Sequence, residues 1–189
     1  MSLKLLVISD PHVQEPLSAA HPRRESWWIA GEVHTRAAED PVEAMPSMFD
    51  EEELHPAAIL VPGDVAHKAS PTGFKVGWDR IRLIASDLGG LPVFGTLGNH
   101  DCQSRDANGD PFRIAKRVQT FPAGPPGPPP SYYEQGFAIV ELTTGCELVV
   151  VNSALHHFTE AQARAGTFDQ AAIDRLAAAL KTRPRVSRI

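Results

Sequence analysis

Three short apolar segments, each followed at once by polar residues, constrain the fold of this chain most. They are LKLLVIS, AAILVPG and LPVFGTLG, at residues 3–9, 57–63 and 91–98. Each has the length and aliphatic composition of a buried strand, and each ends in turn residues. A helical pattern, FKVGWDRIRLIASDLGG, separates the second segment from the third, and Gly89 is its expected C-cap. Strands that alternate with helices predict an α/β domain.

The second half of the chain predicts a hairpin and a helix. The segments FAIVEL (137–142) and CELVVVNS (146–153) read as strands, and TTG joins them as a hairpin turn. TFDQAAIDRLAAALKTRP, residues 167–184, predicts a helix with Thr167 as its N-cap. The hairpin adds antiparallel strands, so the predicted fold class is α/β, a mixed-sheet β-sandwich flanked by helices.

We expect one domain over residues 1–189, with two stretches that break the rhythm of strands and helices. Residues 13–56 read as an insertion after the first strand, with at least one helix and the pair Trp27 and Trp28. These tryptophans either cap a substrate pocket or pack the insertion onto the body. Residues 122–131 are rich in proline and predict an extended loop.

Composition excludes several classes of protein. The formal net charge is -5 and the basic residues are scattered, so there is no clear nucleic-acid footprint. No apolar segment approaches the roughly 18 residues of a membrane span, and we expect no membrane association. Cys102 and Cys146 form no disulfide framework, so a reducing, cytoplasmic location is expected.

Polar side chains follow each of the first three predicted strands. They are Asp10 and His12, then Asp64, then Asn99, His100 and Asp101. Any one of them alone is explained by turn and cap chemistry. Together they are expected to converge, because the carboxyl ends of strands in an open α/β sheet form the ligand site. Carboxylate, imidazole and amide ligands suit Mn, Fe, Zn or Mg, and two such ions about 4 Å apart can clamp a phosphate ester.

The motifs SDPH, GDVAHK and GNHD, in this order and each after an apolar strand, resemble the D-x-H, GD and GNH[DE] motifs of calcineurin-like metallophosphoesterases. The resemblance implies a four-layer α/β/β/α fold and two divalent metal ions (Mn²⁺, Fe²⁺/Fe³⁺, Zn²⁺ or Mg²⁺). It implies hydrolysis of a phosphate mono- or diester by attack of a metal-bound hydroxide. The substrate would be a phosphate ester, with nucleotides among the candidates.

The resemblance also implies a role for each motif residue. Asp10 and His12 would bind the first metal, Asp64 would bridge the two metals, and Asn99 would bind the second. His100 would contact the scissile phosphate. Asp101 would orient His100, a role with physical sense of its own because a carboxylate fixes the tautomer of an imidazole.

The chain departs from the family pattern after residue 101. The family completes its site with three further histidines, but only His156 and His157 follow His100, and they lie in the loop before the last predicted helix. The second metal site is therefore incomplete in this chain. The chain ends at PRVSRI, where the family begins its next strand, so we expect a C-terminally truncated domain.

Three interpretations of this departure stay open. The remainder of an enzyme is missing, or a completing chain or oligomer partner supplies it, or the chain is a degenerate, non-catalytic module that binds at most one metal. His67, three residues after Asp64, can approach the site from its loop. The alternative, a solvent-exposed loop histidine, is the one we expect.

Overall fold

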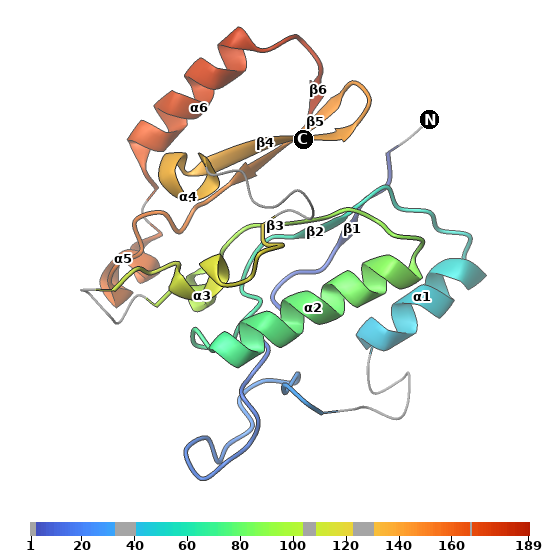
Figure 1. Cartoon of the computed structure of the whole chain (residues 1–189), viewed down its shortest axis with the longest axis vertical. Coiled ribbons are helices and arrows are strands. Elements are labelled where there is room, and N and C mark those ends of the chain that lie inside the picture. The colour runs from blue at the N-terminus through green and yellow to red at the C-terminus, as the bar shows by residue number, and fades with distance from the viewer. Residues whose placement is uncertain (1–2, 33–40, 104–108, 123–130, 167) are drawn as a thin grey trace.

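The computed structural model describes residues 3–32, 41–103, 109–122, 131–166 and 168–189. It is a mixed α/β structure with two three-stranded sheets flanked by helices, as the sequence predicts (Figure 1). In chain order the elements are β1 (Leu6–Val7), α1 (Pro41–Glu51), β2 (Ile59–Val61), α2 (Pro71–Asp87), β3 (Val93–Gly95), a 3₁₀ turn (Asn99–Asp101), α3 (Arg113–Lys116), α4 (Ser131–Gln135), β4 (Phe137–Thr143), β5 (Cys146–Val151), α5 (Glu160–Ala165), α6 (Gln170–Thr182) and β6 (Ser187–Arg188).

The first sheet is parallel and has the order β1-β2-β3. Leu6 pairs with Ile59, and Ile59 pairs in turn with Val93, so the three strands run in register. Each strand is shorter than its apolar segment, because the residues after the ladder leave the sheet as loops. Parallel pairing brings the three carboxyl ends to one edge of the sheet.

Helix α2 covers one face of this sheet and begins earlier than its apolar pattern indicates. The hydroxyl of Ser70 caps it by accepting a hydrogen bond from Gly73 N–H at 2.7 Å. Trp78 and Ile81 are fully buried on the inner face of the helix. The predicted C-cap at Gly89 is wrong by one residue. Leu88 is the cap, and Gly89 follows with a φ of 92°.

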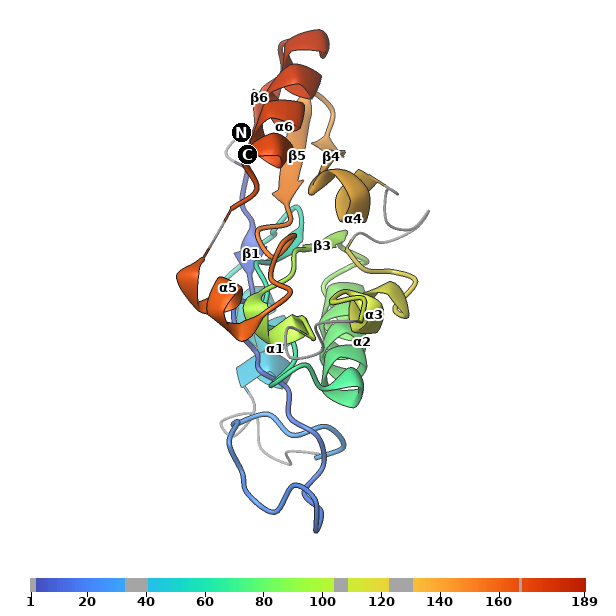
Figure 2. The same ribbon diagram turned by 90° about the vertical axis from the view of Figure 1, so that its left-hand side faces the viewer.

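The second sheet and α6 lie on the opposite side of the first sheet from α2 (Figures 1 and 2). Strands β4 and β5 form the predicted antiparallel hairpin, and β6 adds to β5 in parallel. The N-cap of α6 is Asp169, whose carboxylate accepts from Ala171 N–H at 3.0 Å. The predicted cap Thr167 lies outside the described residues. The hydroxyl of Thr96 joins the sheets by donating to the carbonyl of Val151 at 2.5 Å.

The insertion after β1 packs onto the body of the molecule. Trp28 is buried, and the guanidinium of Arg80 on α2 lies 4.9 Å from the centre of its ring. Packing is therefore the role of Trp28, whereas Trp27 is exposed. The helix expected within the insertion is α1. The proline-rich segment falls largely on residues 123–130, outside the described part of the chain. Among the described helices, none combines the length and the apolar character needed to cross a bilayer.

Candidate metal centre

The predicted site residues lie where the strands of the first sheet end. Asp10 and His12 follow β1, Asp64 follows β2, and the turn Asn99–Asp101 follows β3. The first two loops are joined directly, because His12 N–H donates to the carbonyl oxygen of Asp64 at 2.9 Å. The structure thus brings together segments that are more than 30 residues apart in the sequence.

Asp10, His12 and Asp64 form a group whose donor atoms lie within 4.8 Å of one another. Nε2 of His12 is 3.7 Å from Oδ1 of Asp10 and 3.9 Å from Oδ2 of Asp64. These separations are too long for hydrogen bonds. They fit donors around one ion, because two ligands at about 2.0–2.2 Å from a metal lie at most about 4.4 Å apart. The donor set therefore fits a divalent cation.

All three residues of this group have left-handed backbone conformations. The φ angles are 52° for Asp10, 46° for His12 and 53° for Asp64. Asp and His tolerate this region better than most residues, but it still costs free energy that the surrounding structure must offset. The conformation turns successive side chains away from the strand direction, so that both residues of the D-x-H motif face Asp64.

Two glycines allow the loops after β2 and β3 to touch. A Cβ atom at Gly63 would lie 2.5 Å from the backbone nitrogen of Gly98, and one at Gly98 would overlap the carboxylate of Asp64. This contact lets Oδ1 of Asp64 accept the backbone N–H of His100 at 2.8 Å. One oxygen of Asp64 is thereby fixed, while the other faces His12.

Asp101 is fully buried and fastens the same two loops together. Its Oδ1 accepts from Ala66 N–H at 2.7 Å, and its Oδ2 accepts from Gly98 N–H at 3.0 Å. Burial raises the pKa of Asp101 to about 7, although these hydrogen bonds act in the opposite direction. Among the described residues no hydrogen bond joins Asp101 to the ring of His100, and its carboxylate instead acts on the backbone of the loops.

Residues 3–156 match the family model of the calcineurin-like phosphoesterases. The chain belongs to this family. The match spans the first sheet, all of the strand-end residues and the hairpin of the second sheet. Calcineurin-like phosphoesterases are hydrolases of phosphate esters that use divalent metals, and the Asp10, His12 and Asp64 group suits such an ion. A comparison with curated proteins finds no match.

A second group beside the first contains three histidines. His12, His67 and His100 each offer a nitrogen within 4.8 Å of the others, and the rings of His12 and His100 pack edge to face at 4.7 Å. The expectation that His67 is a solvent-exposed loop residue is wrong, because its side chain is only 15% exposed. The spacing of three residues from Asp64 was the signal that could have identified it.

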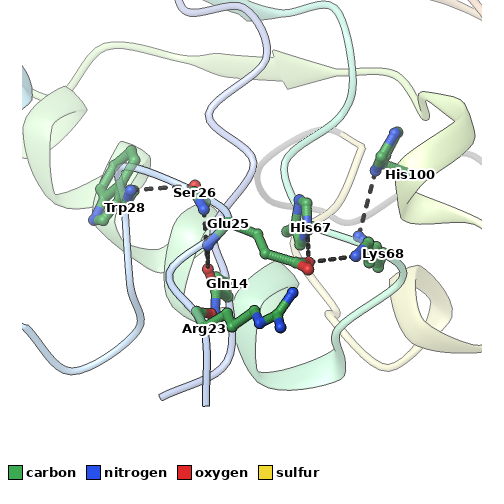
Figure 3. Close-up of polar contacts among 8 residues, drawn as sticks. All are labelled: Gln14, Arg23, Glu25, Ser26, Trp28, His67, Lys68 and His100. Carbon is green, nitrogen blue, oxygen red and sulfur yellow. Dashed lines mark hydrogen bonds and ion pairs between the residues drawn. The ribbon is translucent and has the colours of Figure 1, made fainter. Parts of the chain in front are cut away.

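The environment of His100 favours a neutral ring. Burial lowers the pKa of His100, and the charge of Asp64 opposes this effect. Its Nδ1 lies 3.4 Å from the backbone N–H of Lys68, which donates to it (Figure 3). A neutral imidazole that accepts at Nδ1 carries its proton on Nε2. The ring therefore presents Nε2–H as a hydrogen-bond donor.

The other predicted site residues have different surroundings. Asn99 begins the 3₁₀ turn beside His100 and has an exposed side chain. Among the described acidic, histidine and cysteine residues, His156 and His157 belong to neither group that could hold an ion. Nε2 of His156 instead lies 3.2 Å from the carboxylate of Asp169, and His157 is buried.

Proposed function

We propose that this chain is a metal-dependent phosphoesterase that hydrolyses a phosphate mono- or diester. The observation that carries the proposal is the group of Asp10, His12 and Asp64 at the carboxyl ends of β1 and β2. Its oxygen and nitrogen donors suit Mn, Fe, Zn or Mg. The membership of the calcineurin-like phosphoesterase family supports the same chemistry.

In this proposal Asp10, His12 and Asp64 hold one ion, and Asp64 is shared with a second ion that Asn99 helps to hold. When bound, such ions supply positive charge to the phosphate and lower the pKa of the water that attacks phosphorus. The protein fixes Asp64 through the hydrogen bond from His100 N–H at 2.8 Å. The carboxylate therefore needs little reorganisation when it binds a metal.

His100 is proposed to act on the substrate. With Nδ1 accepting from Lys68 N–H, its Nε2–H can donate to the phosphate or to the leaving oxygen as the ester bond breaks. Asp101 is a positioning residue in this scheme. It holds the loop of Gly98 against that of Ala66. It thereby helps to position His100, which directly precedes it in the chain and whose backbone N–H donates to Asp64.

Hydrolysis of p-nitrophenyl phosphate and bis-p-nitrophenyl phosphate with added Mn²⁺ tests the proposal and separates mono- from diesterase activity. We expect Asp64→Asn to lower kcat/KM about 1,000-fold and His100→Ala to lower it about 100-fold. The matched controls Asp169→Asn and His156→Ala should stay near wild type. A chelator should abolish activity and Mn²⁺ should restore it. Activity that survives both the chelator and Asp64→Asn would refute the proposal.

The alternative is a non-catalytic module of the same fold that binds at most one metal. Two observations favour it. The side chain of Asn99 is exposed, and His156 and His157 belong to neither of the two groups that could hold an ion. Metal content per folded chain distinguishes the two, because one equivalent or none favours the module and two favour the enzyme. Two equivalents found only in an oligomer would indicate that a partner chain completes the site.

We also propose a cytoplasmic location. Cys102 and Cys146 are both free, which suits a reducing compartment. A fluorescent fusion followed by cell fractionation tests this, and recovery outside the cytoplasm would contradict it.

A further inference from the structure

A pocket of about 490 Å³ lies beside the histidine group. One wall consists of residues between Gln14 and Glu25 in the insertion, and the other consists of residues between His67 and Pro71. His67 lines the pocket and also belongs to the group with His12 and His100. The pocket therefore adjoins the candidate metal centre, and its volume is that of a small-molecule site.

The insertion wall of the pocket is held in place by Gln14, which is 5% exposed. Its side-chain nitrogen donates to the carbonyl of Arg23 at 2.6 Å, and its side-chain oxygen accepts from the N–H groups of Glu25 and Ser26 at 2.7 and 2.9 Å (Figure 3). One buried amide thus organises the loop from Arg23 to Ser26. The pocket wall is preformed rather than assembled by a ligand.

The two walls are tied together by Glu25. Its carboxylate accepts from the ammonium group of Lys68 and lies 3.1 Å from Nε2 of His67 (Figure 3). These partners lower the pKa of Glu25, the hydrogen bond from Lys68 most of all. Glu25 and Lys68 therefore form an ion pair with one another, and we do not expect either charge to be the main contact of a ligand.

Arg23 is a cation of the lining that pairs with no carboxylate in the described ranges, whereas Lys68 is paired with Glu25. Glu15, the other acidic residue of the lining, accepts from the hydroxyl of Ser70 at 2.7 Å. The guanidinium of Arg23 has no hydrogen bond or ion pair with any residue in the described ranges, and its side chain extends toward Glu25 (Figure 3). The 17-residue helix α2 begins at Pro71, which also lines the pocket. The N-terminus of a helix carries a partial positive charge.

We propose that this pocket receives the leaving group of the substrate and that Arg23 binds a second anionic group on it, a phosphate or a carboxylate. The inference rests on the proposed function, which places the scissile phosphate at the metal centre beside His67. A guanidinium binds either anion with two parallel hydrogen bonds. The substrate class is then a phosphate ester whose leaving group carries its own anion, in the size range of a sugar phosphate or a nucleotide.

Binding of phosphonates to the full chain in Mn²⁺, measured by calorimetry, tests this without turnover, because carbon–phosphorus bonds are not hydrolysed by an esterase. The probes are alkane bisphosphonates, phosphonoalkanoates and simple alkylphosphonates of equal chain length. We expect wild type to bind either the bisphosphonates or the phosphonoalkanoates, which carry a second anion, roughly tenfold more tightly than the alkylphosphonates. The series that binds more tightly identifies the second anion.

Variants assign this preference to Arg23. Arg23→Ala should remove the tenfold preference, Arg23→Lys should keep part of it, and Arg164→Ala, an exposed arginine on α5, should leave it intact. Thermal melting checks that each variant is folded. A preference that persists in Arg23→Ala, or none in wild type, would overturn the inference. If the preference is present but p-nitrophenyl phosphate is not hydrolysed, the proposed function fails and the anion site stands.

Discussion

The two halves of the molecule are stabilised in different ways. Residues 3–122 contain the parallel sheet, the fully buried side chains of Phe74, Trp78 and Ile81, and all of the candidate centre. In the C-terminal half, α5 contributes no buried residue and α6 contributes only Ala172. The first half depends on contacts between distant segments, and the second depends mainly on a local hairpin. The strained loops of the candidate metal centre thus lie in the better packed of the two halves.

The largest difference in stability between the halves should appear when one isoleucine in each half is replaced by alanine. Ile81→Ala removes a fully buried side chain and should lower the free energy of unfolding by about 4 kcal/mol. Ile173→Ala on α6 removes one that is 41% exposed and should cost less than about 1 kcal/mol. Urea denaturation measures both. Equal losses would show that the C-terminal half contributes as much to the core as the first.

Two glycines test the close contact of the loops that carry the candidate metal centre. Gly98→Ala places a methyl group against Asp64 and should cost about 3 kcal/mol, together with most of the metal affinity. Gly145→Ala in the β4–β5 turn meets no atom within 4 Å and should cost about 1 kcal/mol, because its φ is 81°. Denaturation and metal titration measure these effects. A Gly98→Ala variant with normal metal binding would contradict the contact.

A matched pair of aspartates should give a smaller difference. Asp101→Asn replaces one oxygen that accepts a backbone N–H by a group that cannot accept it, and should cost about 2 kcal/mol. Asp169→Asn should cost less than about 1 kcal/mol, because asparagine caps a helix as well as aspartate does and only the ion pairs with Arg175 and His156 are weakened. Thermal melts at neutral pH compare them, and an Asp101→Asn variant as stable as wild type would remove Asp101 from its positioning role.

The smallest effect should appear only on acidification. The hydrogen bond from Arg183 contributes most to lowering the pKa of Glu147, and Arg188 on β6 acts in the same direction. A lowered folded-state pKa stabilises the protein above the ordinary value of 4.5, and this stabilisation is lost as pH falls below it. Hydrogen exchange should show β5 and β6 opening first below pH 4.5, and Glu147→Gln should remove this dependence. Opening of β2 before β5 on acidification would contradict the view that the C-terminal half is the less stable one.

The sequence predicted β1 to β5, α2 and α6 because apolar segments and turn residues are local signals, whereas the short helices α3, α4 and α5 were not predicted. Alternation of strands and helices indicated the parallel sheet, and TTG indicated the hairpin. Strand lengths were overestimated, because residues such as Ser9 and Pro62 leave the ladder to form the loops. The caps of α2 and α6 were misplaced by one or two residues, since several neighbouring residues can cap a helix equally well.

The candidate centre was predictable where a motif carries it, as for Asp10, His12 and Asp64. The contacts of Asp101 were not, because its partners are backbone N–H groups of Gly98 and Ala66, which no side-chain pattern reveals. Nor was the pocket beside His67. It depends on an amide, that of Gln14, which hydrogen-bonds to a loop about ten residues later in the chain.

The left-handed backbone of Asp10, His12 and Asp64 has a consequence for the evolution of this protein. Glycine adopts such angles without steric cost, so replacement of Asp10 or His12 by glycine relieves local strain while removing a proposed metal ligand, whereas Asp64 also holds the N–H of His100. Selection for heat resistance alone would therefore favour the loss of candidate metal ligands. Variants evolved for thermal endurance will keep their chemistry only if every round also screens for bound metal.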